Sequence, residues 1–599
     1  MGVCAGHNIP TAGDLIDLSV AAMVNCVGKR TPGRSKVRIW ISLLVVPLLL
    51  TACGPASQPG DRQAAAPGAQ ITGPKRITAA IMSNPPTISA DNVVAGSGTY
   101  QGGDALEELM NAGLTYMDEL GRRRPQLAEA APTLENGLWK VLPDGRMETS
   151  WTLRSDAVWH DGTPITTADL LFTADLSRDK DLPVFEDPEW DYVESLQARD
   201  ARTLVAHWKS TYIRADNLLL NVRPKHILER TFVEDKLAVL SHPYWNEQFI
   251  GAGPFRLKEF ARDSHLIMSA YDGYIFGRPK IDEITVRFIP DNNALIASIL
   301  AGEVQLTLGR NLSLQQSMEL KEHWKDGYID VGFSNWIALW PQMLNPNPPV
   351  LLDVRFRRAL LHAMDRKQMN ETLLYNAAPL ADVLFHPGEP AFRDIEPFIV
   401  KYEYDPRRAI QLIESLGYAR GADGFFRDAS GQTLPLEVRT SGGEDTHEMG
   451  LFSAADYFRQ VGIAAEPFII PQAQRNDREF NATFPGVRLW RQNNDILSVD
   501  RLHSREATLA ANRFTGSNRS RYMNAEFDAM IDKYMVTISE RERVPMLQQI
   551  VRHITENVTL LDLWYNAETI MVGNRLQNVV NKKTSRANQA WNAHEWVLQ

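Results

Sequence analysis

SWTLRSDAVWHDGTPITTADLLFTADL, residues 150–176, mixes ionisable and apolar side chains so densely that two interpretations compete. One is a catalytic or metal site, and the other is a turn followed by a capped helix. Residues 160–164 have turn chemistry, because Asp favours turns, Gly accepts positive φ and Pro keeps the preceding residue extended. Thr166 suits a helix N-cap, with Asp169 three residues later as in a capping box. Since neither a paired base nor a cluster of ligands lies nearby, the structural interpretation is favoured.

Length and composition indicate a globular protein of several structural units. The chain has 599 residues, of which 44% are hydrophobic, so two or three units are expected. A net charge of −10 argues against nucleic acid as a partner, because phosphate binding needs clustered Lys and Arg. All three cysteines, Cys4, Cys26 and Cys53, lie at the N-terminal end, which excludes thiol catalysis and Cys-ligated zinc from the rest of the chain. No metal or cofactor is predicted.

The N-terminal segment has the order of an export signal. A basic stretch is followed by an apolar run, residues 39–50, that is too short to cross a membrane. Leu50-Thr51-Ala52-Cys53 then resembles the bacterial lipobox, in which the cysteine is lipidated and becomes the new N-terminus. An ordinary secretory signal with an incidental cysteine is the alternative. We predict an export signal at 1–53, translated from Met23 or later, with a lipid on Cys53, and a flexible tether at 54–75.

Beyond the tether the sequence predicts alternating strands and helices. Strand patterns occur at 76–82, 147–154, 203–208, 253–260, 265–271 and 283–289. Helical patterns occur at 104–118, 291–301, 355–363, 406–416, 448–460, 525–536 and 540–557. Mixed elements over this length indicate an α/β protein with more than one lobe.

Seven blocks, in order, resemble the family 5 extracellular solute-binding proteins, the dipeptide and oligopeptide receptors of ABC importers. In the first block, 150–176, Trp159, Asp161, Gly162, Pro164, Thr166 and Asp169 fit the family pattern, and Thr167 replaces the usual Ala. The others are RPQLAEAAP (124–132), FIGAGPFRLKEF (249–260), the stretch 271–305, DVRFRRALLHAMDRKQM (353–369), YDPRRAIQLIESLGY (404–418) and YMNAEFDAMIDK (522–533). The resemblance spans nearly all of residues 76–570.

The resemblance implies an α/β, two-lobed periplasmic-binding-protein fold of the large cluster C type, with an extra subdomain in lobe I and hinge closure on ligand. It places lobe I at 76–330 plus 561–599 and lobe II at 331–560. It also implies a monomeric, non-enzymatic, extracytoplasmic receptor, anchored to the bacterial cell membrane through Cys53. That receptor would deliver a peptide or peptide-like solute to ABC permease and ATPase subunits, which supply the energy because no ATP-binding motif is present.

Other functions stay open. A sensor lipoprotein would need the same cleft, and relatives bind nickel chelates, haem, opines and sugars, so a sugar, an opine or a metal chelate is an alternative ligand. An extracellular hydrolase is disfavoured, because H-E-x-x-H, G-x-S-x-G and a cysteine nucleophile are absent. The polar stretch GEDTHEMG, residues 443–450, lacks a second histidine at helical spacing and is interpreted as a loop.

The candidate ligand-binding residues lie mainly in LWRQNNDILSVD, residues 489–500. In the family, a lobe II aspartate in a W-x-x-D-Y context often pairs with the α-amino group of the peptide. Here Trp490 matches but Asn493 takes the aspartate position, and Asp495 is the alternative if the loop, including Asn494, is shifted. An amide is a weaker partner for an ammonium than a carboxylate, which disfavours a zwitterionic peptide.

Two further kinds of residue are candidates. Arg491, like Arg488 beside Trp490, suits a ligand carboxylate, although such arginines more often lie in salt bridges or on solvated faces. Trp336 and Trp340 are candidates for stacking on ligand, with packing in the core as the alternative.

Overall fold

The computed structural model describes residues 73–89, 100–182, 185 and 188–599. The predicted export signal, Cys53 and nearly all of the predicted tether lie outside the described residues. Within the described part of the chain, no helix has both the length and the apolar character needed to cross a membrane.

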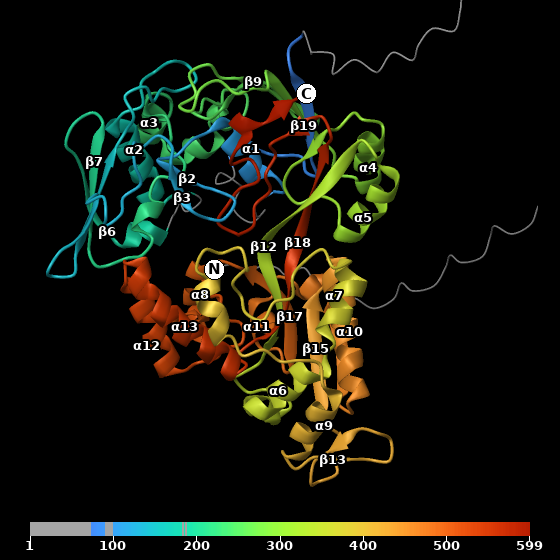
Figure 1. The fold of residues 1–599 in the computed structure, drawn as a ribbon. Helices are drawn as coiled ribbons and strands as arrows, with labels where there is room; N and C mark the ends of the chain where they lie inside the picture. Colours follow the sequence, from blue (N-terminus) through green and yellow to red (C-terminus); the bar gives the residue numbers. More distant parts are fainter. Residues whose placement is uncertain (1–72, 90–99, 183–184, 186–187) are drawn as a thin grey trace, which may run out of the picture. The chain divides into compact units, whose positions relative to one another are not determined.

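A ten-stranded mixed sheet runs through the described residues (Figure 1). Its strands, in spatial order, are β16 (Ala464–Ile470), β15 (Pro435–Ser441), β17 (Val487–Asn493), β12 (Gly327–Pro341), β18 (Leu561–Gly573), β11 (Leu306–Thr307), β1 (Arg76–Ile81), β10 (Glu283–Phe288), β9 (His265–Ala270) and β8 (Phe255–Ala261). The long strands β12 and β18 pair antiparallel and connect the two ends of this sheet. Their register shifts between Phe333 and Trp336, so the connection is irregular midway along both strands.

Strands β15, β16 and β17 are mutually parallel. Their carboxyl ends, at Ser441, Ile470 and Asn493, therefore lie at one edge of the sheet. In open sheets with parallel strands this edge is where ligands bind.

Smaller sheets complete the strand inventory. A four-stranded antiparallel sheet has the order β4 (Trp139–Val141), β5 (Met147–Thr152), β7 (Thr203–Trp208) and β6 (Val193–Ala198). The remaining pairs are β2 (Thr115–Met117) with β3 (Arg123–Pro125), β13 (Ala419–Arg420) with β14 (Phe426–Arg427), and β19 (Leu576–Gln577) with β20 (Val597–Leu598).

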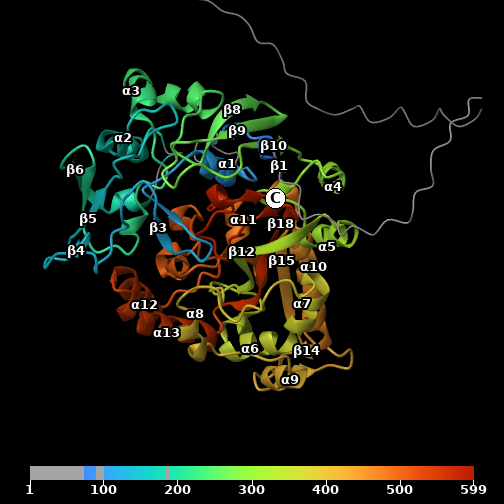
Figure 2. The same ribbon diagram turned by 45° about the horizontal axis from the view of Figure 1, so that its top comes forward.

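The helices cover these sheets. They are α1 (Gly103–Met110), α2 (Thr167–Arg178), α3 (Lys225–Glu234), α4 (Asn292–Leu300), α5 (Leu314–His323), α6 (Val354–Ala363), α7 (Arg366–Leu374), α8 (Phe392–Ile395), α9 (Pro406–Glu414), α10 (Asp445–Gln460), α11 (Arg478–Ala482), α12 (Ala525–Val536) and α13 (Glu540–Glu556). Helix α10 packs on β15, β16 and β17, and α2 packs on β6 and β7 (Figures 1 and 2).

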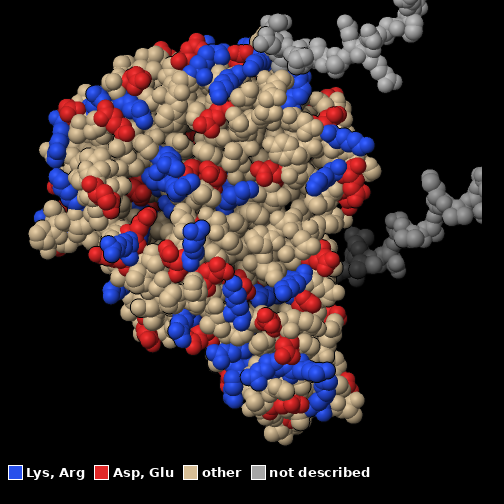
Figure 3. All heavy atoms as spheres, in the orientation of Figure 1, with Lys and Arg blue, Asp and Glu red and all other residues tan. Residues whose placement is uncertain are grey.

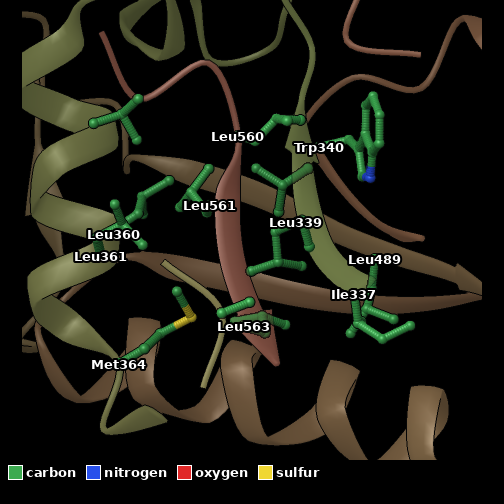
Figure 4. Close-up of a cluster of buried hydrophobic side chains, with 14 of the residues drawn as sticks. Ile337, Leu339, Trp340, Leu360, Leu361, Met364, Leu489, Leu560, Leu561 and Leu563 are labelled. Atoms are coloured by element: carbon green, nitrogen blue, oxygen red, sulfur yellow. The ribbon is translucent and has the colours of Figure 1, made fainter. Parts of the chain in front are cut away.

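The largest hydrophobic cluster joins α6 to the middle of the large sheet. Figure 4 shows Leu360 and Leu361 of α6 beside Leu339 of β12 and Leu561 and Leu563 of β18. All five side chains are buried, and burying such a side chain contributes about 1.5–3 kcal/mol. This packing fixes the end of β12 beside the beginning of β18.

The predicted strands and helices are confirmed to within a few residues, with two differences. Helix α10 begins at Asp445, within the stretch 443–450 interpreted as a loop. Helix α1 ends at Met110, and the rest of the expected helix 104–118 contains strand β2. Gly113 explains the break, because a Cβ there would lie 2.0 Å from the carbonyl oxygen of Leu220. The backbone at residues 219–220 lies against Gly113 and Leu114, and the N–H of Leu114 donates to the carbonyl of Leu219 at 3.0 Å.

The structural interpretation of residues 160–169 is also confirmed. The N–H of Ala168 donates to Thr166 Oγ1 at 3.3 Å and the N–H of Thr166 donates to Asp169 Oδ2 at 2.9 Å, which together form a capping box on α2. His160 Nδ1 accepts from the N–H of Gly251 at 3.2 Å, and its Nε2–H donates to the carbonyl of Gly253 at 3.0 Å. Burial lowers the pKa of His160 to about 4, so the ring is a neutral bridge between backbone groups.

Candidate functional site

A cavity of 490 Å³ lies at the edge where β15 and β17 end. Its wall contains residues from both predicted lobes and from the middle of β18. Carboxamide side chains are its most frequent lining groups: Gln101, Asn292, Asn311, Gln316 and Asn566. None of the described residues that line it is aromatic. Its volume falls within the range of about 300–1,000 Å³ typical of small-molecule sites, and its polar wall suits a ligand rich in hydrogen-bonding groups.

Three charged side chains meet in this cavity (Figure 3 shows the charged groups on one face of the molecule). The guanidinium of Arg491, on β17, lies 2.7 Å from the Glu444 carboxylate. The guanidinium of Arg310, from the other predicted lobe, lies 3.5 Å from the same carboxylate oxygen. Burial lowers the pKa of Arg491, while Glu444 opposes this shift and Arg310 adds to it. Two cations therefore share one anion here.

Glu444 stands at the N-terminus of α10, which opens onto the cavity. The preceding Gly443 has φ +98°, and its N–H donates to Glu448 Oε1 at 2.7 Å. Only glycine adopts this backbone conformation without strain. The Glu444 side chain does not cap the helix, so first-turn N–H groups add a partial positive charge beside the two guanidiniums.

A second carboxylate in the cavity wall, Glu568 on β18, is already occupied. It accepts hydrogen bonds from Ser334 Oγ and, at 3.4 Å, from Asn335 Nδ2, and it lies 3.6 Å from Lys582 Nζ. Asn335 is also the antiparallel register partner of Asn493. The predicted ligand residue Asn493, on β17, therefore lies opposite a residue of β12 that bonds to Glu568.

Trp336 and Trp340 are fully buried in the core formed by β12, β17 and β18. Figure 4 shows Trp340 within this cluster. The Nε1–H of Trp336 donates to Asp562 Oδ1, and burial raises the pKa of this carboxyl to about 7. Neither indole is accessible to a ligand in this structure, which favours packing in the core over stacking on a ligand, the two alternatives considered for them.

Trp490 lies between two arginines. The guanidinium carbons of Arg488 and Arg519 are 4.3 Å and 4.4 Å from the ring centroid, so cations already cover its faces. Arg488 is buried and donates to the carbonyl of Asn481 at 2.8 Å. Burial, with Arg519 nearby, lowers the pKa of Arg488 to about 9. Trp490, which is half-buried, and Arg488 thus belong to a cluster in which guanidiniums already pack against the indole ring.

Asn494 and Asp495 form hydrogen bonds with Ser585, in the C-terminal part of the chain. The N–H of Ser585 donates to Asn494 Oδ1 at 3.0 Å, and its hydroxyl donates to Asp495 Oδ2 at 2.6 Å. Asp495 Oδ1 also accepts from the N–H of Leu497 at 3.0 Å, as the N-cap of a short 3₁₀ helix. Both side chains are buried, and their oxygens are engaged in these contacts.

Residues 124–499 match the bacterial extracellular solute-binding proteins, family 5. The chain belongs to this family. Oligopeptide-binding protein AppA of Bacillus subtilis is 22% identical over 510 residues, covering 82% of this chain and 87% of AppA. A putative ABC transporter peptide-binding protein of Brucella ovis is 23% identical over 457 residues, covering 74% of this chain and 80% of the relative.

Solved structures of similar proteins show the same fold. The oligopeptide-binding protein of Thermus thermophilus, complexed with a pentapeptide, has a TM-score of 0.65 at 22% identity and covers 87% of this chain and 96% of its own. The mixed α/β architecture with one large sheet is therefore the two-lobed fold of family 5 proteins, as the resemblance implied.

Of the ligand-binding residues predicted for this family 5 protein, Arg491 is the one that lines the cavity. Sequence reasoning missed Arg310, Glu444 and Glu568, which are far apart in the chain. Glu444 belongs to the stretch interpreted as a polar loop, yet helix α10 begins at Asp445.

The described part of the chain contains no group of three or more His, Cys, Asp or Glu side chains suited to a metal ion.

Proposed function

We propose that this family 5 protein is the substrate-binding lipoprotein of an ABC importer. It captures a peptide or peptide-like solute in the 490 Å³ cavity and delivers it to permease and ATPase subunits. Membership of the family and the names of the two relatives support this role. The protein acts as a monomer outside the cytoplasm, attached to the cell membrane through lipid on Cys53.

The two lobes have the boundaries 76–330 plus 561–599 and 331–560. The distribution of buried hydrophobic residues supports this division. One cluster draws nearly all its members from 331–560 and from the first residues of β18, 561–565, whereas two others are built mainly from residues 77–308 with, in one of them, residues 570–596. The start of β18 thus packs with lobe II, and the rest of this strand packs with lobe I. In this arrangement the irregular middle of β12 and β18 is the hinge.

The amide-rich wall of the cavity is the observation that supports a peptide-like ligand. Carboxamides both donate and accept hydrogen bonds, so they suit the peptide groups of a bound chain. Asn292 and Gln316 bond to each other, and Asn311 Nδ2 donates to the carbonyls of Gly309 and Thr569, whereas Asn311 Oδ1 has no partner within the described structure and can accept from a peptide N–H. A planar ligand such as haem favours aromatic walls, and none of the described lining residues is aromatic. A sensor with the same ligand is the second candidate, because sensing and import need the same cavity. The protein binds without catalysis.

Isothermal titration calorimetry of the full-length protein in detergent, with tri- to pentapeptides, tests this function. We expect saturable binding without peptide cleavage by mass spectrometry. Cleavage that survives repurification would overturn the receptor role, and absence of binding would overturn the peptide-like ligand. Separately, Cys53→Ala is expected to release the protein from membranes, and unchanged membrane retention would contradict the lipid anchor.

A further inference from the structure

Two cationic side chains, Arg310 and Arg491, contact a single carboxylate, Glu444. Both guanidiniums approach Glu444 Oε1, at 3.5 Å and 2.7 Å, so one carboxylate oxygen serves two cations. His447 Nε2 lies 3.5 Å from the other oxygen, but burial lowers the pKa of this imidazole, which favours its neutral form. The Arg310–Glu444–Arg491 group thus carries one surplus positive charge.

The other carboxylates near this group are held by partners of their own or are exposed to water. Glu568 is taken by Lys582 and by hydrogen bonds from Ser334 and Asn335. Asp445, in the first turn of α10, is exposed to solvent, as Arg310 is, so water screens the charges of both side chains. Glu448, also in the first turn of α10, accepts from the N–H of Gly443 at 2.7 Å and offsets part of the positive potential of the helix N-terminus.

Glu444 is also easily displaced. Its side chain is 36% exposed, and that of Arg310 is 46% exposed. Ion pairs with this exposure contribute little to stability, because water and salt screen them. Arginine binds carboxylates through two parallel hydrogen bonds, so another carboxylate entering the cavity can compete for the same guanidiniums.

We propose that Glu444 is an internal place-holder for a carboxylate of the solute. On binding, the solute carboxylate takes over Arg310 and Arg491 at the first turn of α10, and Glu444 turns out to water. The site therefore selects carboxylate-bearing solutes, and the charge at Glu444 lowers their affinity. This inference rests on the proposed solute-binding role of the same cavity.

Calorimetry with trialanine, N-acetyl-trialanine and trialanine amide tests the place-holder on the full-length protein. We expect both carboxylate probes to bind the wild type at least about tenfold more tightly than the amide. Glu444→Gln should bind N-acetyl-trialanine about fivefold more tightly, because the competing carboxylate is gone. Arg491→Gln and Arg310→Gln should each weaken that binding about tenfold, with Arg491→Lys intermediate.

Matched controls are Glu466→Gln and Arg513→Gln, which change exposed charges away from the cavity and should leave affinity unchanged. Circular dichroism establishes that each variant is folded. Weaker binding of every probe by Glu444→Gln, or equal binding of the amide and the acids, would overturn the inference while leaving the receptor role intact. If none of the probes binds the wild type at millimolar concentration, the peptide-receptor proposal fails and the place-holder fails with it.

Discussion

Arg214 Nη2 lies 3.1 Å from Asp500 Oδ2, although 286 residues separate them. The same nitrogen donates to the carbonyl of Leu497 at 3.0 Å. Together with the contacts of Ser585 to Asn494 and Asp495, this pair joins residues 494–500 to two segments of predicted lobe I. The stretch expected to bind ligand therefore holds the two predicted lobes together.

Arg214→Gln should lower the free energy of unfolding by about 1–2 kcal/mol, because it leaves a largely buried Asp500 carboxylate without its cation. Urea denaturation measures this loss. The double variant Arg214→Gln/Asp500→Asn should be more stable than Arg214→Gln alone, since the stranded charge is then removed. With Asp500→Asn as the fourth protein of the cycle, losses of the two single variants that add up to the loss of the double variant would show that the pair is not coupled.

Trp336→Phe should destabilise the protein by about 1–3 kcal/mol without changing solute affinity. The phenyl ring fills most of the space, but Asp562 loses the indole N–H that bonds to it. Thermal denaturation and calorimetry on the same sample separate the two effects. A large loss of affinity in a fully folded variant would instead support the ligand-stacking role for Trp336.

The fold was largely predictable from the sequence, because its signals are local. Strand alternation and helix caps, such as Thr166 with Asp169, depend on residues within a few positions of each other. The candidate site is different, since Arg310, Glu444 and Arg491 come from separate elements that only the folded sheet brings together. The burial of Trp336 and Trp340 likewise depends on neighbouring strands β17 and β18, which are distant in the sequence.

His160→Ala should weaken the protein without affecting ligand binding. The imidazole satisfies the N–H of Gly251 and the carbonyl of Gly253, and its loss leaves both groups unpaired in a buried place. We expect a loss of about 1–3 kcal/mol in urea denaturation. His160→Gln is the informative comparison, because an amide can both donate and accept and should recover part of this stability. Unchanged stability of His160→Ala would contradict the structural role of the ring.

Glu389 predicts a pH dependence of stability. This carboxyl is buried, and its Oε1 has no hydrogen-bond partner within the described structure. Burial raises its pKa to about 8, with Arg586 opposing and Asp495 adding to the shift. Between the unfolded value, about 4.5, and pH 8 the folded protein retains a proton that the unfolded chain releases. Glu389 therefore destabilises the fold progressively as pH rises through this interval.

Glu389→Gln removes this titration while keeping the shape of the side chain. We expect the variant to be more stable than the wild type at pH 8, by at least about 1 kcal/mol, and close to it at pH 5, where both side chains are neutral in the folded protein. Urea denaturation at several pH values measures the difference. Asp445→Asn, which changes an exposed carboxylate, is the control and should show no such trend. A difference between Glu389→Gln and wild type that stays constant from pH 5 to pH 8 would show that Glu389 is ionised in the folded protein throughout.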